Sequence, residues 1–241
     1  MDKQYTFQDF REIVATLRSE NGCPWDKEQT HKSLKPCMME EAAELVSAIR
    51  IYDQTGSAEN MREELGDILL QVVMHSQIAK EEGLFTLDDV VQEISEKMVR
   101  RHPHVFGDVL ADTSEEVLRN WDEIKKQEKE GKEWIPSPLQ EIPKELPALT
   151  RAPKVLKKVD KLYEPQVNAQ AAVVRMAEEV EALKVAVNCQ NNEIVESEIG
   201  NLLVEIAQIG RLYKLPLEQI LTDKVEDMIE KHEGNAHNVI K

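Results

Sequence analysis

Two short stretches, MMEEAAELVSAIR at 38–50 and NMREELGDILLQVVMHSQ at 60–77, decide the fold of this chain. In each stretch apolar residues recur at helical spacing, which predicts two helices joined by a turn at 53–57. Acidic residues stand among them, at positions where a packed helix pair is ordinarily apolar. The sequence therefore predicts two helices that pack together and carry carboxylates at the edge of their core.

The acidic residues have a spacing that brings their side chains together. Glu40, Glu41 and Glu44 are three or four residues apart, and Glu64 and Asp67 repeat the spacing of three in the second helix. Close carboxylates repel one another and resist desolvation, so they need a countercharge. A divalent metal ion supplies one, and oxygen ligands alone favour a hard ion, Mg²⁺ or Mn²⁺.

Glutamate is also a good helix former, and most glutamate clusters are solvated helix faces. The second acidic motif, one short turn away, favours a shared site instead. Gly66 adds to this interpretation, because a glycine inside a helix costs about 1 kcal/mol relative to alanine and a closely approaching backbone or ligand would explain it. A di-iron bundle would need a Glu-x-x-His motif, and an EF-hand would place its acids in a loop.

A basic cluster ends the third predicted helix, which begins at the cap Thr86 and runs to about Arg101. Lys97, Arg100 and Arg101 lie in its last turns, where cations complement the negative end of the helix dipole. In an acidic chain, three bases close to an expected metal site are better interpreted as a triphosphate clamp. His102 and His104 follow at 102–104, but no third nearby ligand completes a zinc site.

Two further segments carry large aromatic side chains. Trp121 and Lys125 are four residues apart in a helix that begins near Thr113, so an indole and an ammonium can address one ligand together. A core tryptophan beside a surface lysine is the alternative. Earlier in the chain, residues 25–31 are predicted as a polar loop in which Trp25 serves either the core or a ligand.

Composition excludes several classes of function. The chain has 46 acidic and 30 basic residues and a formal net charge of −16, which argues against a nucleic-acid polymer or an anionic membrane as main partner. Three cysteines without C-x-x-C spacing are typical of a reducing cytoplasm and give no structural zinc site. An apolar run of 18 residues and a signal-peptide core are both absent, so neither export nor a membrane span is expected.

The chain is predicted to consist of two related units. Five prolines at 136, 138, 143, 147 and 153 forbid a long helix and indicate a linker at 131–153. Beyond it, 178–183 matches 40–45, 198–203 matches 64–69 and 215–232 matches 85–102, which indicates a duplicated domain rather than a solenoid. The predicted architecture is all-α, with two tandem helical-bundle units at 1–130 and 154–241.

The second unit is a degenerate copy of the first. Ala182 stands at the position of Glu44 and Asn201 at that of Asp67, so two acidic positions of the motif are neutral. In the basic cluster, Asp227 replaces Lys97 and Glu230 replaces Arg100. Glu41 and Glu64 keep counterparts in Glu179 and Glu198, and Arg101 in Lys231. Because two of the four ligand charges and two of the cations are lost together, we expect no catalysis by 154–241.

These motifs resemble a known family. The residues 40–44 and 64–67 resemble the metal motif of the all-α nucleoside triphosphate pyrophosphohydrolases, and GCPWDKEQTH (22–31) and RRHPHVF (100–106) resemble its MazG branch. The resemblance covers nearly the whole chain. It implies Mg²⁺-dependent hydrolysis of an NTP or dNTP to the monophosphate and pyrophosphate by the first unit, with Mn²⁺ as a possible substitute, in a cytoplasmic homodimer.

The resemblance also implies roles for particular residues. Metal ligands would be Glu41, Glu44, Glu64 and Asp67, with Glu40 orienting the hydrated ion or accepting a proton from the attacking water. The substrate would be held by the remaining candidates, with phosphates on Lys97, Arg100, Arg101 and Lys125, the base on Trp121, and a pocket wall of Trp25 and Asp26. Two alternatives stay open: a phosphohydrolase of a modified nucleotide or alarmone, and a non-enzymatic helical interaction protein.

Overall fold

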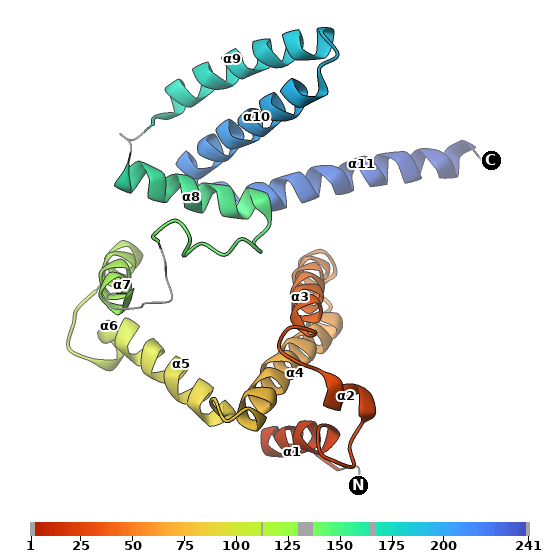
Figure 1. Cartoon of the computed structure of the whole chain (residues 1–241), viewed down its shortest axis with the longest axis vertical. Helices are drawn as coiled ribbons and strands as arrows, with labels where there is room; N and C mark the ends of the chain where they lie inside the picture. The colour runs from red at the N-terminus through yellow and green to blue at the C-terminus, as the bar shows by residue number, and fades with distance from the viewer. Residues whose placement is uncertain (1–2, 112, 130–136, 164–166, 240–241) are drawn as a thin grey trace. The chain divides into compact units, whose positions relative to one another are not determined.

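The computed structural model describes residues 3–111, 113–129, 137–163 and 167–239. All regular secondary structure within these ranges is helical, which confirms the all-α prediction. The chain divides into two compact units, residues 1–130 and 131–241, and Figure 1 follows it through both. Among the described helices, none combines the length and the apolar character that a membrane crossing requires.

The first unit consists of helices whose ends follow local sequence signals. They are α1 (Phe7–Leu17), α2 (Pro24–Glu28), α3 (Lys35–Thr55), α4 (Glu59–Glu81), α5 (Leu87–Arg101), α6 (Pro103–Phe106) and α7 (Ser114–Lys129). Thr6 and Thr86 each cap a helix in a reciprocal capping box with an aspartate three residues on, and the cap at Thr86 is the predicted one. Gly56 caps the end of α3 with φ 74°, a left-handed conformation that glycine adopts without strain.

The two central helices are longer than predicted. α3 begins at Lys35 and ends at Thr55, where 38–50 was expected, and α4 spans Glu59–Glu81 rather than 60–77. Apolar residues continue both helices, Ile51 and Tyr52 in α3 and the buried Ile78 and Ala79 in α4, and a few polar residues follow them. The turn therefore shrinks to 56–58. The polar loop predicted at 25–31 is also wrong in part, because Pro24 begins the short helix α2, where its fixed φ suits the first helical position.

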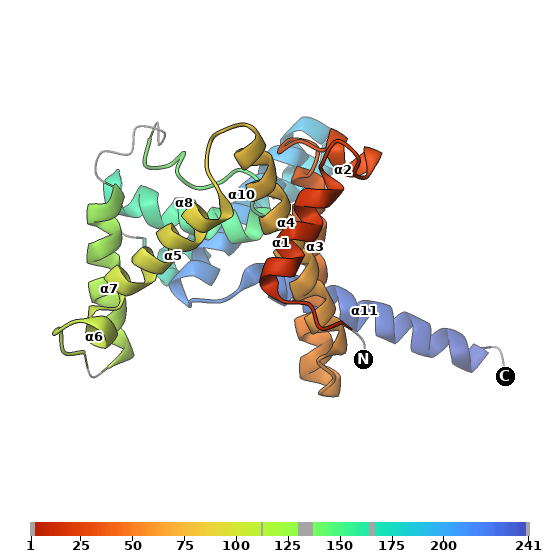
Figure 2. The ribbon, with the colours of Figure 1, turned by 90° about the horizontal axis from the view of Figure 1, so that it is seen from below.

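The core of the first unit lies where α1, α4 and the start of α5 meet. It is formed by Val14, Leu34, Val73, Met74, Ile78 and Leu87. Since Leu87 is the first residue of α5, this helix packs against the second half of α4 and then leaves it. In Figure 1 and Figure 2 alike, α6 and α7 lie apart from the α3/α4 pair. The unit therefore has two arms, α3/α4 and α5–α7, joined at the turn between α4 and α5.

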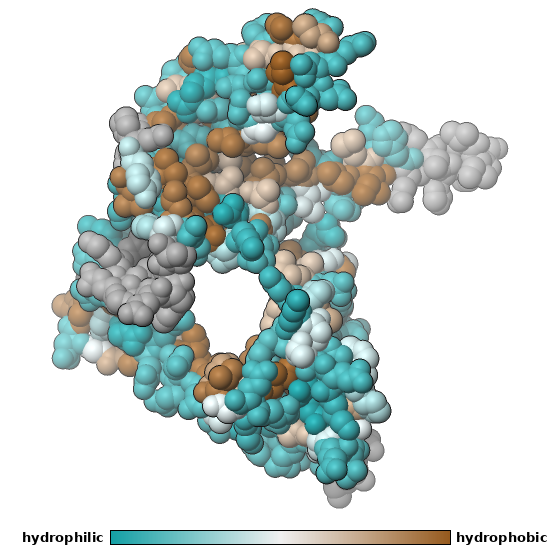
Figure 3. Space-filling model, in the orientation of Figure 1, coloured by the Kyte–Doolittle hydropathy of each residue, from teal (hydrophilic) through white to brown (hydrophobic). Residues whose placement is uncertain are grey.

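In the described residues of the second unit, 137–163 and 167–239, the helices are α8 (Ala148–Leu162), α9 (Ala169–Asn188), α10 (Asn192–Leu212) and α11 (Leu217–Val239). α9 pairs with α10, and α8 packs on α10 and α11. An ion pair joins Arg175 of α9 to Glu205 of α10 at 2.7 Å, and another joins Asp160 of α8 to Arg211 of α10. Hydrophobic side chains gather over α8 and α10 in Figure 3.

The predicted linker ends earlier than expected. Residues 137–147 are not helical, as the prolines predicted, but α8 begins at Ala148 and continues through Pro153. Pro153 is in the second turn of α8, so it removes one backbone hydrogen bond near the helix start, where the cost is smaller than in the interior. Residues 131–136, which include Pro136, lie outside the described part of the chain.

Candidate functional site

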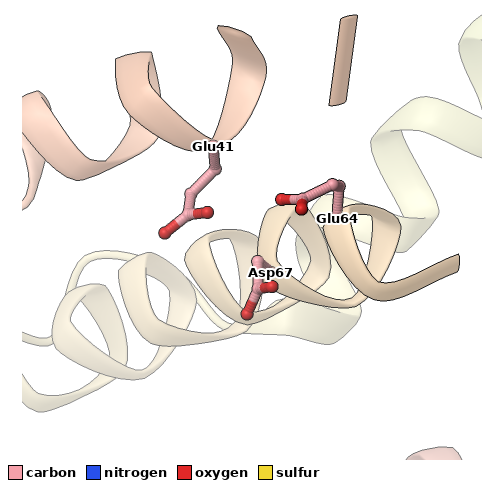
Figure 4. A group of neighbouring side chains, drawn as sticks. All are labelled: Glu41, Glu64 and Asp67. Atoms are coloured by element: carbon pink, nitrogen blue, oxygen red, sulfur yellow. The ribbon is translucent and has the colours of Figure 1, made fainter. Parts of the chain in front are cut away.

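Three carboxylates converge between α3 and α4. Glu41 extends from α3, and Glu64 and Asp67 extend from neighbouring turns of α4, so that one oxygen of each lies within 4.8 Å of the others. Figure 4 shows the three side chains pointing toward one another across the helix pair. Glu44, one turn along α3, is exposed and outside this group of three, and Glu40 is exposed as well. We refer to Glu41, Glu64 and Asp67 as the carboxylate cluster.

Glu64 is the innermost member of the carboxylate cluster, with 8% of its surface exposed. Its Oε1 accepts a hydrogen bond of 2.7 Å from the Asn60 amide, while its Oε2 is buried and has no hydrogen-bond partner among the described residues. A buried carboxylate oxygen without a donor is costly to desolvate. The cluster is thus built to receive a cation or a donor that the chain itself does not supply.

Electrostatic repulsion shows in the pKa of Glu41. Its pKa is raised above the usual value for a glutamate, first by partial desolvation and then by the negative charges of Asp67, Glu44, Glu64 and Glu40, in that order. A bound divalent cation would reverse this repulsion. The donor set is all oxygen, so the residues present fit a hard ion such as Mg²⁺ or Mn²⁺.

Metal binding at this cluster should depend on pH. The ion requires ionised ligands, and the raised pKa keeps Glu41 protonated at a pH where an ordinary glutamate is already ionised. Mg²⁺ affinity measured by calorimetry should therefore weaken as the pH is lowered into the range where glutamates titrate. Replacing Glu41 by Gln should leave a weaker affinity that depends less on pH. Equal pH dependence in both proteins would contradict the assignment of Glu41 as a ligand.

Sequence reasoning missed Asn60, which orients Glu64. Asn60 lies one helical turn before Glu64 on α4, and this spacing of four was the available signal. It also overinterpreted Gly66, since a Cβ placed there would meet no heavy atom within 4 Å. No other described segment of this chain approaches Gly66, so the close approach that its presence suggested is not made within one chain.

A second cluster forms where the end of α5 meets α7. Lys125 lies over the ring of Trp121, with its Nζ 4.2 Å from the centroid, and Arg101 of α5 lies 6.0 Å from the same ring. Arg100 and Arg101 both form ion pairs with Glu128 of α7, at 2.7 Å and 2.5 Å. Lys97 is half-buried one turn earlier on α5. We call Arg100, Arg101, Trp121, Lys125 and Glu128 the basic cluster.

The structure does not bring the basic cluster to the carboxylate cluster within one chain. The sequence interpretation placed these bases near the metal site, but the core contact of α5 with α4 is made by its first residue, Leu87, in the cluster that contains Val73 and Ile78 from the second half of α4. Arg101 follows fourteen residues later, about 20 Å along the helix at 1.5 Å per residue. The carboxylates lie in the first half of α4, on the other arm. The distance along α5 is the physical reason for the separation.

Trp25 and Asp26 lie in α2, in a segment anchored to α4 at two points. Arg18 has a side chain only 5% exposed, donates to the carbonyl oxygens of Asp26 and Gln29 at 2.5 and 3.1 Å, and pairs with Glu81 of α4. Nearby, the Nδ1 atoms of His31 and His75 are 2.8 Å apart. Trp25 itself is 59% exposed. The chain thus presents this indole to solvent on a well-anchored segment.

The His31 contact is the weaker of these anchors at low pH. Burial, and then the neighbouring His31, lower the pKa of His75 below the usual histidine value. The hydrogen bond between the two Nδ1 atoms needs one nitrogen that carries a proton and one that does not. It is therefore lost when low pH protonates both imidazoles. In the Arg18 anchor, partial burial raises the pKa of Glu81, but the hydrogen bonds from Arg18 and Gln77 lower it further, so the net pKa lies below the usual value for a glutamate.

The second unit repeats the geometry of the carboxylate cluster with altered chemistry. The Asn201 amide donates to Glu179 at 3.1 Å and to Glu198 at 3.4 Å. These residues match Asp67, Glu41 and Glu64 in the aligned segments. A side-chain hydrogen bond that protonated Glu198 donates to Glu179 raises the pKa of Glu198, the largest effect on that group. An amide that donates to both glutamates takes the place of the third carboxylate, so this copy has less need of a cation.

Comparison with known proteins identifies relatives along most of the chain. Residues 29–106 match the model of the MazG nucleotide pyrophosphohydrolase domain. The chain is 37% identical over 225 residues to a nucleoside triphosphate pyrophosphohydrolase/pyrophosphatase MazG of Thermotoga maritima, covering 93% of this chain and 83% of that protein. It is 39% identical over 247 residues to a nucleoside triphosphate pyrophosphohydrolase of Escherichia coli K12, covering 95% of this chain and 86% of that protein.

Another relative is longer than this chain. An uncharacterized protein of Bacillus subtilis, YabN, is 44% identical over 219 residues, which cover 90% of this chain and 44% of that protein. The chain thus spans less than half of the length of this relative.

Proposed function

The chain belongs to the MazG family of nucleotide pyrophosphohydrolases, and we propose that it hydrolyses nucleoside triphosphates to the monophosphate and pyrophosphate. The proposed substrates are NTPs and dNTPs, and the proposed cofactor is Mg²⁺, with Mn²⁺ as a substitute. The observation that carries the proposal is the carboxylate cluster, in which Glu64 has a buried oxygen without a donor. The names of the relatives support the same substrate class.

The carboxylates would have two roles, binding of the metal ion and proton transfer. Glu41, Glu64 and Asp67 would hold the ion, and Glu44 would complete the set from the next turn of α3. When bound, the ion supplies charge neutralisation for the phosphates and a lower pKa for the attacking water. The exposed Glu40 carboxylate would orient the hydrated ion or accept the proton from water that attacks the α-phosphorus.

The basic cluster would hold the substrate. Arg100, Arg101 and Lys125, with Lys97 one turn away, present cations for the β- and γ-phosphates, and the Trp121 ring beside them can stack on the base. The exposed Trp25 and its neighbour Asp26 would contribute to the pocket wall. We assign the activity to the first unit because the second has Asn201 in place of a carboxylate.

A direct test is hydrolysis of a panel of NTPs and dNTPs by the full-length protein, with Mg²⁺, with Mn²⁺ and with excess chelator. Turnover should need either ion and stop with the chelator. Turnover that persists in chelator would contradict the role of the carboxylate cluster. The panel also separates this proposal from a hydrolase that accepts only a modified nucleotide or an alarmone.

We also propose that the protein is a homodimer. Apolar side chains on the α3/α4 pair are left exposed: Val46 58%, Ile49 43%, Leu65 51% and Leu69 39%. A partner copy would bury them and offers a second α5–α7 arm, which can carry a basic cluster to the carboxylates. Light scattering should give twice the chain mass, and a mass near 27.6 kDa at every concentration would contradict the proposal. We expect the dimer to be cytoplasmic, which three unpaired cysteines support.

A further inference from the structure

Glu128 joins the two arginines of the basic cluster. Its Oε1 accepts from Arg100, with Nε at 2.8 Å and an Nη2 contact of 2.7 Å, and its Oε2 accepts from Arg101, with Nε at 3.0 Å and Nη2 at 2.5 Å. Oε1 also accepts a longer hydrogen bond of 3.3 Å from the Nε of Arg101, so the two guanidinium groups share one carboxylate. Arg100 and Arg101 are consecutive in α5, and a carboxylate from α7 holds both of them.

The contact offsets an electrostatic cost. Two neighbouring guanidinium groups repel each other, and Lys125 adds a third positive charge to the same cluster. The hydrogen bond from Arg101, followed by that from Arg100, lowers the pKa of Glu128 to about 2. Glu128 is therefore ionised at every pH at which the protein would act, and its charge stabilises both arginines in one arrangement.

Each arginine is held by its edge and keeps other donors available. Glu128 uses the Nε and Nη2 of each side chain, and among the described residues no hydrogen bond involves either Nη1. A guanidinium has five N–H groups in a fixed plane, so holding one edge fixes the direction of the others. The two arginines would then present their remaining N–H groups in a constant geometry.

Burial decides between two possible roles for Glu128. A carboxylate that competes with phosphate would lie on the solvent side of the arginines, where a ligand arrives. The Glu128 side chain is only 11% exposed, whereas that of Arg100 is 52% exposed and that of Arg101 is 15% exposed. Glu128 thus lies on the inner side of Arg100 and beside the largely buried Arg101.

We propose that Glu128 is a positioning residue that holds Arg100 and Arg101 ready for the phosphates of the substrate. The inference rests on the proposed function, since it assigns Glu128 to the clamp of the same site. It predicts that removing the charge of Glu128 changes substrate affinity in the direction opposite to that expected from charge alone. Removing a negative charge from beside phosphates should tighten binding, whereas losing the positioning of two arginines should weaken it.

The test compares Glu128→Gln with Glu123→Gln in the full-length protein. Glu123 is an exposed glutamate on α7, so its variant removes the same charge from the same helix without touching the arginines. For Glu128→Gln we expect KM to rise about 10-fold with kcat within about twofold, because the lost contact acts on substrate binding. Glu128→Asp, which keeps the charge on a shorter side chain, should restore part of the loss, and Glu123→Gln should leave KM unchanged or slightly lower.

A binding measurement separates this inference from the proposed function. Calorimetry with Mg²⁺ and inorganic tripolyphosphate reports the clamp without any catalytic step, and Glu128→Gln should weaken that binding about 10-fold as well. Tripolyphosphate binding that depends on Glu128 in a protein that hydrolyses no NTP would refute the function and keep the inference. An unchanged or lower KM for Glu128→Gln in an active enzyme would overturn the inference alone. A protein that neither binds tripolyphosphate nor hydrolyses NTPs would overturn both.

Discussion

Glu41→Gln and Asp67→Asn should each lower the rate of NTP hydrolysis by about 10²-fold or more, because each removes a charged ligand from the site that binds the ion. Both substitutions keep the size of the side chain. The loss should therefore appear without unfolding, and circular dichroism should be unchanged. Steady-state assays at saturating Mg²⁺ measure the effect.

The second unit offers a matched control for this experiment. Glu179 aligns with Glu41 and also contacts its neighbours across a helix pair. Glu179→Gln in the full-length protein should leave the rate within about twofold of the unaltered chain, since that unit has no basic cluster to complete a site. If Glu179→Gln and Glu41→Gln cost the same activity, the assignment of catalysis to the first unit would be wrong.

Stability should change in the opposite direction from activity. The pKa of Glu41 is raised in the folded protein, so its ionised form is disfavoured there, and folding loses stability as the pH rises through the range between the unfolded and folded values. Without metal, Glu41→Gln should thus unfold at the same or a higher temperature than the unaltered protein at neutral pH. With Mg²⁺, the unaltered protein should gain more stability than Glu41→Gln, since it binds the ion more tightly.

The second prediction with a large expected effect is that the second unit stays inactive even when its missing carboxylates are restored. In a chain that already carries Glu41→Gln, adding Ala182→Glu together with Asn201→Asp should not raise hydrolysis above the residual rate of the Glu41→Gln chain. The acidic residues Asp227 and Glu230 occupy the places of Lys97 and Arg100, and each would repel a phosphate by about 1 kcal/mol in a partly solvated site. Replacing both by Lys and Arg should be needed before any activity returns.

Two fragments give the same test in another form. A fragment of residues 1–135 should keep activity if it folds and dimerises, and one of residues 146–241 should have none. The control is the same fragment pair carrying Glu41→Gln or Glu179→Gln. Nucleotide hydrolysis by 146–241, abolished by Glu179→Gln, would show that the second unit is a working enzyme.

Local signals in the sequence predicted the helices well. The cap at Thr86 formed as expected, because its capping box uses side chains three residues apart and depends on nothing distant. The spacing of three and four placed Glu41, Glu64 and Asp67 on facing surfaces of one helix pair. Pro153 was misjudged because a proline near a helix start loses little, and a sequence pattern does not show where α8 begins.

Contacts between distant elements could not be predicted in this way. Glu128 is seven residues after Trp121, which places both on one face of α7, but its pairing with Arg100 and Arg101 depends on how α7 packs against α5. The burial of Arg18 beneath α2 likewise depends on the fold of the unit. The separation of the two clusters follows from the direction in which α5 leaves α4, a property of packing rather than of local sequence.

The central claim is that the chain cleaves between the α- and β-phosphates of a nucleoside triphosphate, and identifying the products tests it most directly. Phosphorus NMR of the reaction with ATP, GTP, CTP, UTP and their deoxy forms distinguishes the two possible cleavages. We predict nucleoside monophosphate and pyrophosphate in equal amounts, only when Mg²⁺ or Mn²⁺ is present. Nucleoside diphosphate and orthophosphate as products would contradict the claim.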